Sequence, residues 1–364
     1  MKVRATSYDY VEWNVQPFLP GKLFWQPDNN LKQIKSDKNY IKLQVPSRLD
    51  PVVLDYAKLH PTSEENDYKA GAVGFGVGLY TLAEITLTDN PDIEAKGDSP
   101  LVAKHIASIM KQTTKYEGGF SISCKSHNYK HMGFSSTGSL SSAVANGINI
   151  LLGNPYTDDS LVKLVAHNYA EDSELKEGYL TPGISTGSSG HIAQKGGITV
   201  VSSDCELIMR RPIPEGTKIV YGVPPIESGG KGPETSDVDV HSLSWIRHID
   251  RFNAAKVCYW ILMDFMPAMN QGNLKNMGNV LYDTMFCGSK GAPLAPMHGG
   301  DLLGVIFEQR VSGVETCFMS SAGPALVALT QDKEEVAERI FEKYNFKTFK
   351  TEPDNQGSNV LLKE

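Results

Sequence analysis

The sequence predicts an α+β protein, and three observations carry that prediction. Residues 118–125 alternate as a strand, and a loop rich in Gly, Ser and Thr follows over residues 131–139. A helical pattern of apolar residues comes directly after this loop. In the C-terminal part, helices expected at 244–265, 273–287 and 333–344 stand among strands expected at 315–319, 325–330, 347–352 and 359–362.

Length and charge limit the classes of function. A chain of 364 residues is long enough for two or three domains with a sizeable core. Its formal net charge of −7 argues against nucleic acid or an anionic membrane surface as the main partner. Apolar runs are too short for a membrane span, and the first residues lack the apolar stretch of a signal peptide. We therefore expect a cytoplasmic protein that acts on small molecules.

The five cysteines are scattered along the chain and include no C-x-x-C pair. This spacing argues against a zinc site or a disulfide framework, and it fits a reducing cytoplasm.

Residues 1–38 are rich in aromatic side chains, which disordered tails usually lack. We interpret them as an ordered arm that packs on its own domain or on a second subunit, and a homodimer is expected. The aromatic residues are Tyr8, Tyr10, Trp13, Phe18, Phe24 and Trp25.

The N-terminal half reads as a run of strands and helices. A strand over 40–45 is expected to stop at Pro46, and residues 51–55 continue the sheet. Residues 70–85 form a strand whose alternate glycines Gly74, Gly76 and Gly78 indicate close approach of backbone or ligand. Further helices are expected at 101–113 and 158–170, strands at 198–201, 206–209 and 218–223, and a mobile lid or domain connection at 227–239.

Three segments of small residues stand far apart in the sequence, at 133–139, 185–190 and 319–324. Small residues allow backbone N–H groups to approach an oxyanion, hydroxyls add donors, and a following helix adds its dipole. Each segment alone could be an ordinary capped turn. Convergence of all three on one cleft would form a phosphate-binding arrangement.

The motifs together resemble a known family. Pro46-Ser47-Arg48-Leu49-Asp50, the loop His131-Met132-Gly133-Phe134-Ser135-Ser136-Thr137-Gly138 and the run Met319-Ser320-Ser321-Ala322-Gly323-Pro324 look like the β-ribofuranosylaminobenzene 5′-phosphate synthases. These belong to the superfamily of galacto-, homoserine, mevalonate and phosphomevalonate kinases. The resemblance covers residues 41–345.

The resemblance implies a two-domain GHMP-kinase-like fold, with an aromatic arm over 1–38, a ribosomal S5-like domain over 39–212 and a ferredoxin-like domain over 213–364. It implies a C-riboside synthase that joins phosphoribosyl pyrophosphate to a carboxylated aromatic or heteroaromatic ring. Pyrophosphate and carbon dioxide leave, and Mg²⁺ is the expected cofactor. Relatives that make C-nucleosides use the same chemistry.

The resemblance also suggests site residues. Arg48, Asp50 and Asp55 would be catalytic, although Arg48 could instead form an ion pair with Asp50, and Asp55 could be structural. The pyrophosphate would bind at Gly133, Ser135, Ser136, Thr137, Gly138 and Ser139. Substrate would bind at Ser47, Ser185, Thr186, Gly187, Ser188, Ser189, Gly190, His191, Ser320, Ser321 and Gly323, and the metal ligands are not identified.

Departures from the family leave alternatives open. Ser135 stands where the family has Gly, Thr137-Gly138 replaces Gly-Thr, and Thr186 sits where an arginine is usual. An ATP-dependent small-molecule kinase of the same superfamily is the main alternative, and a non-catalytic ligand-binding or scaffolding relative is the third.

Several further side chains have a functional and a structural interpretation. His131 could donate to a phosphate or lie under the loop as a structural residue, and Lys195 could meet substrate charge. Lys290 and His298 could border the cleft, although a solvated loop is the simpler interpretation. Asp237, Asp239 and His241 could hold a metal, although their spacing is loose. Met263, Met266, Met269 and Met277 fall at helical spacing and are expected in the core.

Overall fold

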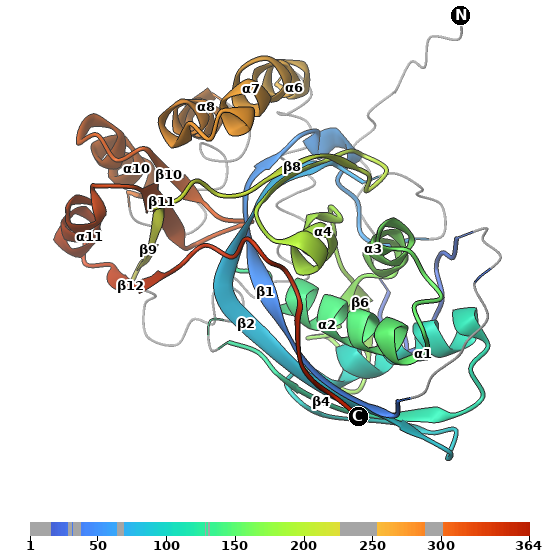
Figure 1. Cartoon of the computed structure of the whole chain (residues 1–364). Helices are drawn as coiled ribbons and strands as arrows, with labels where there is room; N and C mark the ends of the chain where they lie inside the picture. Colours follow the sequence, from blue (N-terminus) through green and yellow to red (C-terminus); the bar gives the residue numbers. More distant parts are fainter. Residues whose placement is uncertain are drawn as a thin grey trace, which may run out of the picture.

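Two main sheets with helices on their faces and a two-stranded ribbon make up the described part of the chain (Figure 1). The structure is a computed structural model that describes residues 16–27, 31, 38–63, 69–127, 129, 132–225, 253–287 and 301–364. None of the helices in these ranges is both long and apolar enough to cross a membrane. The α+β class expected from the sequence is therefore confirmed.

The larger sheet has seven strands and is built around two long antiparallel strands, β1 (Tyr40–Val53) and β2 (Ala72–Thr88). Its main path runs β13-β1-β2-β4-β3, and β7 and β8 continue from the first residues of β2. The remaining strands are β3 (Ile93–Gly97), β4 (Gly119–Lys125), β7 (Ile198–Val201), β8 (Leu207–Arg211) and β13 (Asn359–Lys363).

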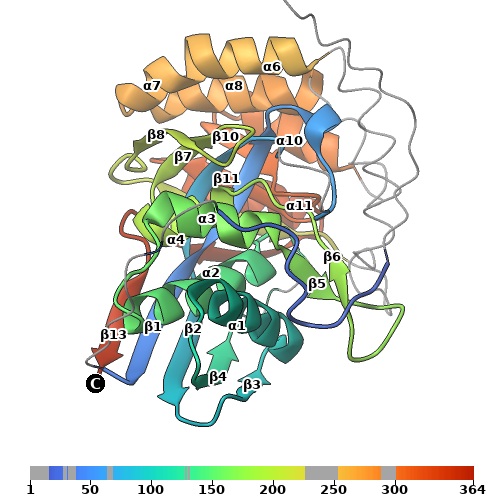
Figure 2. The same cartoon turned by 90° about the vertical axis from the view of Figure 1, so that its right-hand side faces the viewer.

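Four helices cover one face of the larger sheet (Figures 1 and 2). Alternate residues of β1, such as Ile41 and Leu43, are fully buried against apolar residues of the second helix, such as Val144 and Ile148. This matches the alternation of strands and the helical spacing in the sequence. The helices are α1 (Pro100–Thr114), α2 (Ser136–Leu151), α3 (Asp158–His167) and α4 (Ser188–Lys195), and the short strands β5 (Ala170–Asp172) and β6 (Leu180–Pro182) form a separate ribbon.

The smaller sheet has four antiparallel strands in the order β10-β11-β9-β12. They are β9 (Lys218–Val223), β10 (Thr316–Met319), β11 (Leu326–Thr330) and β12 (Lys347–Thr351). Its helices are α6 (Ala254–Trp260), α7 (Met266–Asn270), α8 (Leu274–Cys287), α10 (Leu302–Val311) and α11 (Glu334–Lys343), and a π-helical stretch (Ile261–Phe265) joins α6 to α7. One apolar core extends from this sheet to the ends of β1 and β2 that lie nearest to it.

The expectation that the first strand stops at Pro46 is wrong, because β1 continues to Val53. Strand β13 pairs with β1 only between Ile41 and Gln44, so the proline lies where no ladder hydrogen bond is needed on that side. The pairing with β2 shifts register just after Pro46 and again around Pro51. Irregularities of this kind are where a strand tolerates proline.

The last strand of the chain returns to the larger sheet, although the sequence grouped it with the C-terminal domain. Residues 352–357 lead to it by crossing the glycines of β2. A Cβ on Gly76 would lie 2.6 Å from the carbonyl oxygen of Asp354, and Asp354 N donates to Gly76 O over 2.9 Å. The alternate glycines of β2 therefore allow another backbone segment to approach closely, which is the first of the two alternatives, backbone or ligand, given for this pattern.

Other elements differ from the sequence expectations. Strand β3 and helix α10 were not expected, and α4 falls inside a segment read as small-residue loop. The helix expected over 244–265 continues to Asn270, and its first residues lie outside the described ranges. Met269 and Met277 are buried as expected, but Met263 is 52% exposed, because it lies on the outer face of the π-helical stretch.

The described part of the N-terminal arm packs on its own chain. Phe18 pairs with Leu180, and the amides of Phe24 and Trp25 donate to Asn168 Oδ1. Gly21 N donates to Nδ1 of the buried His105 over 3.0 Å. These contacts agree with the interpretation of the arm as a segment that packs on its own domain. Tyr8, Tyr10 and Trp13 lie outside the described residues, and the homodimer stays a prediction.

We predict that His105 makes the free energy of unfolding fall as the pH is lowered from about 6.5 to about 4. Burial lowers the pKa of His105 from 6.5 to about 4, so in this window the unfolded chain binds more protons. The loss should be on the order of 3 kcal/mol. Urea unfolding of the wild type and of His105→Leu at pH 7, 6, 5 and 4 measures it. Equal pH dependence in the two proteins would contradict the assignment.

Candidate anion site

The first and third small-residue segments meet on β1. Ser320 Oγ donates to the carbonyl oxygen of Gly133 over 2.7 Å and accepts from the backbone N–H of Asp50 at 3.1 Å. Ser321 N donates to Asp50 O over 2.9 Å. The turn between β10 and β11 therefore joins the Gly133 loop to β1, and residues almost two hundred positions apart lie side by side.

The second segment meets the first at the N-termini of two helices. Ser135, the N-cap of α2, and Ser189, in the first turn of α4, have their hydroxyl oxygens 2.7 Å apart. Arg48 Nε donates to Ser189 Oγ over 3.1 Å. A Cβ on Gly138 would lie 2.4 Å from Ser135 Oγ and 2.7 Å from Ser189 Oγ, so the two helices approach where only a glycine fits.

An ion pair on β1 stands at the centre of these contacts. Arg48 Nη1 lies 2.5 Å from Asp50 Oδ2, and the two side chains are only 10% and 5% exposed. The ion pair considered from the sequence is therefore present, but it is buried, whereas the sequence interpretation placed it on the surface. Because Arg48 also reaches α4 and the backbone of Asp50 reaches the β10–β11 turn, the same two residues hold all three segments.

The backbone at both helix starts is left-handed. Ser135 has a φ of 56° and Gly187, the N-cap of α4, a φ of 79°. A left-handed N-cap favours glycine, and this chain places a serine at that position at some strain. The first turn of α2 presents its N–H groups and the positive end of its dipole, a combination that favours an anion. At the start of α4 the N–H groups of Gly187, Ser188 and Gly190 already donate within the chain, so this helix contributes its dipole and the hydroxyl of Ser189.

Two of the expected binding residues lie beneath the loop instead. Ser47 and Ser139 are buried, and their hydroxyls lie 3.5 Å apart in a network that continues to Thr81, 2.9 Å from Ser139 Oγ. Ser139 Oγ also donates to Ser136 O over 3.0 Å. These serines support the first turn of α2 from the side of the sheet.

The remaining predicted residues fall into two groups. Ser185 Oγ and Thr186 Oγ1 accept from the backbone N–H groups of Gly187 and Ser188, which shapes the start of α4. His191 is fully buried and donates from Nε2 to Cys205 O over 2.7 Å. Burial lowers the pKa of His191, so the ring is neutral and serves packing.

Asp55 and several loop residues stand apart from this geometry. Asp55 follows the end of β1, with its carboxylate 3.9 Å from Lys58 Nζ, and Lys195 lies 3.8 Å from Asp158 on α3. The other candidates lie outside the described residues: His131, Lys290, His298, Asp237, Asp239 and His241. In the ranges that are described, no three His, Cys, Asp or Glu side chains gather to hold a metal ion.

Sequence reasoning missed one residue at the site. Tyr169 is buried within reach of Thr137 and Arg48, and its hydroxyl donates to Glu171 Oε1 over 3.1 Å. Burial raises the pKa of Tyr169 well above 10, so it stays protonated and can donate. Tyr169 belongs to no motif, and only the tertiary fold brings it here.

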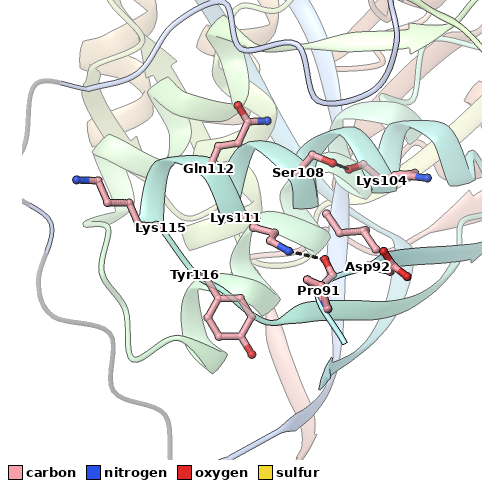
Figure 3. A pocket seen from close by; sticks show the side chains of 9 residues that line it. Pro91, Asp92, Lys104, Ser108, Lys111, Gln112, Lys115 and Tyr116 are labelled. Atoms are coloured by element: carbon pink, nitrogen blue, oxygen red, sulfur yellow. Dashed lines mark hydrogen bonds between the residues drawn. The ribbon is translucent and has the colours of Figure 1, made fainter. Parts of the chain in front are cut away.

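A separate pocket of about 600 Å³ lies at the outer edge of the larger sheet, between α1 and the segment before β3 (Figure 3). Lys104, Lys111 and Lys115 line it, and Lys111 Nζ donates to Pro91 O. Lysines on one exposed helix face indicate a solvated basic surface. The buried ion pair and converging helix starts make the cluster around Arg48 the better candidate.

The comparisons with known proteins show which fold the chain has. Residues 101–178 match the family model described as the GHMP kinases N terminal domain, and the chain has the α+β fold of the GHMP kinases over about nine-tenths of its length. No curated protein sequence matches the chain significantly. The GHMP-kinase-like fold expected from the motifs is confirmed.

Particular solved structures share this fold. Homoserine kinase from Cytophaga hutchinsonii ATCC 33406 is 17% identical, with a TM-score of 0.62 over 91% of this chain and 100% of that one. Mevalonate diphosphate decarboxylase from Staphylococcus aureus is 13% identical, with a TM-score of 0.63 over 89% and 98%. A structure named MDDEF in complex with MVAPP, AMPPCP and magnesium is 13% identical, with a TM-score of 0.62 over 89% and 99%.

We predict that Gly138→Ala weakens anion binding without unfolding the protein. The added methyl group would separate the hydroxyls of Ser135 and Ser189, whereas alanine inside a helix is favourable by up to about 1 kcal/mol. Calorimetric titration with Mg²⁺ and pyrophosphate should show at least a tenfold loss of affinity, with a melting temperature within a few degrees of wild type. Unchanged affinity would mean that the anion does not sit between these helices.

Proposed function

We propose that this chain is a Mg²⁺-dependent enzyme that binds a pyrophosphate group at the starts of α2 and α4. We further propose that it joins phosphoribosyl pyrophosphate to a carboxylated aromatic or heteroaromatic ring through a carbon–carbon bond. The observation that carries the first part is the convergence of the three small-residue segments on Arg48 and Asp50. The motif resemblance supports the choice of reaction.

The bond changes of this reaction balance without an added oxidant or reductant. The bond between the anomeric carbon and the pyrophosphate oxygen breaks, and pyrophosphate leaves with the electron pair. A ring carbon that bears a carboxylate bonds to the anomeric carbon. Carbon dioxide then leaves, and its bonding electrons restore the aromatic ring. Helix N–H groups and hydroxyls at the cluster would stabilise the departing pyrophosphate.

This reaction requires no strong protein base, and the carboxylates at the cluster are engaged in contacts with other side chains. Asp50 is bound by Arg48, and the Glu171 carboxylate accepts a hydrogen bond from Tyr169. The segment 185–195 that starts α4 contains no carboxylate. Positioning of the two substrates would then supply most of the rate enhancement.

An ATP-dependent small-molecule kinase is the second candidate, and the comparisons favour it. The matched domain is described as that of the GHMP kinases, and a homoserine kinase shares the fold over the whole of its own length. A kinase would place the ATP phosphates at the same helix starts and a hydroxylated acceptor beside them. The two candidates share the anion site and differ in the donor.

Magnesium suits either donor. The ion takes oxygen ligands and is commonly held by substrate phosphates together with few protein groups. Serine hydroxyls and phosphate oxygens at the cluster provide such ligands, and one structure with this fold contains magnesium with AMPPCP. When bound, Mg²⁺ would neutralise charge on the leaving group. The expected partners are small molecules.

We predict that Mg²⁺ with phosphoribosyl pyrophosphate stabilises the protein by about 2.7 kcal/mol at a hundred times its Kd, and that Mg²⁺ with ATP does so only weakly. Thermal unfolding with each donor separately measures this, followed by a screen of aromatic acids for release of carbon dioxide. Stabilisation by ATP alone, with phosphate transfer to a hydroxylated acceptor, would replace the synthase by the kinase.

A double variant tests the part of Arg48 and Asp50. Arg48→Met alone would leave a buried carboxylate unpaired, which destabilises a fold by about 3–5 kcal/mol, whereas replacing both partners is often neutral. We expect Arg48→Met/Asp50→Leu to fold and to lose donor-induced stabilisation. Arg310→Met, which removes a surface pair with Asp283, is the control and should respond like wild type.

A further inference from the structure

Helix α6, the π-helical stretch and α7 follow one another without a break over residues 254–270 and form one rod at the top of the molecule in Figure 2. One side of this rod packs on the core, where side chains such as Ile261 are buried. The outer side is apolar as well, since Tyr259 and Leu262 are each 60% exposed and Met263 is 52% exposed. A helix that is apolar all round is normally covered on every side, so this outer side indicates an interaction surface.

Another surface helix of the smaller sheet shows the usual pattern. Helix α11 buries apolar side chains such as Ile340 and Phe341 against the sheet. Its exposed residues are all charged, namely Glu335, Arg339, Glu342 and Lys343. The outer side of the rod therefore differs from a helix surface that is adapted to water.

The rod carries two charged side chains, Lys256 and Asp264, and both are exposed. Lys256 Nζ donates to Cys287 O over 3.0 Å and lies 5.2 Å from the centre of the Trp260 ring. In the part of the chain that the structure describes, neither charge lies within ion-pair distance of an opposite charge. Each of the two can therefore pair with a charge on another molecule.

The spacing of these charges suits a second copy of the chain. Lys256 and Asp264 stand four residues before and four residues after Trp260. The first step lies in α6 and the second in the wider π-helical turn, so the two charges return to nearly the same side of the rod. If two rods pack antiparallel about a two-fold axis near Trp260, Lys256 of each copy meets Asp264 of the other. A parallel pair would instead bring like charges together.

We propose that residues 254–270 form the interface of a homodimer in which the rods of two copies pack antiparallel. Tyr259, Leu262 and Met263 would lie between the two ion pairs, so that apolar burial supplies the affinity and the charges fix the orientation. The inference goes beyond the proposed function, because it holds for either donor.

The size of the surface sets the expected strength of the dimer. A rod roughly 25 Å long covers only part of the about 800 Å² that each partner buries in a standard interface. We therefore expect a dimer that dissociates in the micromolar range, unlike an obligate dimer with a larger interface.

The experiment is sedimentation velocity of the full chain from about 1 to about 100 µM, which measures the dimer dissociation constant. The proteins are wild type, Lys256→Glu, Asp264→Lys, the double variant with both changes, and the control Lys347→Glu at an exposed lysine of β12. Each single change should raise the dissociation constant at least tenfold, since the symmetry places like charges together at two positions. The double variant should return to within about threefold of wild type, and the control should match wild type.

A further variant tests the apolar part of the surface. Leu262→Glu should abolish the dimer, because it would bury a charge between the two rods. Since Leu262 is mostly exposed in the single chain, the variant should melt within a few degrees of wild type at a concentration where both are monomeric.

Three results would overturn the proposal. The first is a wild type that stays monomeric up to about 100 µM. The second is a dimer that neither single charge reversal weakens, and the third is a double variant as weak as the single ones, because the two charges then do not meet. Binding of a monomeric wild type to phosphatidylcholine vesicles, lost in Leu262→Glu, would assign the surface to a lipid membrane instead.

Discussion

The buried ion pair between Arg48 and Asp50 is the contact on which the rest of the site depends. A buried pair depends on its geometry and on further hydrogen bonds, and here residues from distant parts of the chain bond to Arg48 and to the backbone of Asp50. Ser189 of α4 accepts from Arg48, and Ser320 and Ser321 bond to the backbone of Asp50. Hydrogen bonds to these two residues of β1 thus connect the start of α4 and the β10–β11 turn, and Ser320 connects that turn to the Gly133 loop.

The two sheets have separate tasks in this arrangement. The larger sheet carries α2 and α4, whose starts provide the donors, and the smaller sheet sends the β10–β11 turn to close the Gly133 loop. The residues that lead to β13 tie the end of the chain to the other end of α4, since Gly197 N donates to Asp354 O and Ser358 N to Ala193 O. Helix α4 is therefore held at both ends, which keeps its N-terminus in place for a ligand.

The local elements could be predicted from the sequence, because their signals are local. Alternation in β1 and β9, helical spacing in α2 and the glycines of β2 all depend on neighbouring residues. The three small-residue segments were also visible, but their convergence was not, since it depends on a pair buried between two sheets. Helix α4 was missed because Gly and Ser are poor helix formers, and its helical state is imposed by packing. Tyr169 was missed because it belongs to no motif and only the fold brings it close to Arg48 and Thr137.

Hydrogen exchange of the backbone amides with and without Mg²⁺ and pyrophosphate tests most directly whether the three segments form one site. The geometry predicts that residues 133–139, 185–190 and 319–324 gain protection together at a single ligand affinity, because they share the Arg48–Asp50 pair. Protection confined to one of the three segments, or protection of the lysine-lined pocket on α1 instead, would contradict the account.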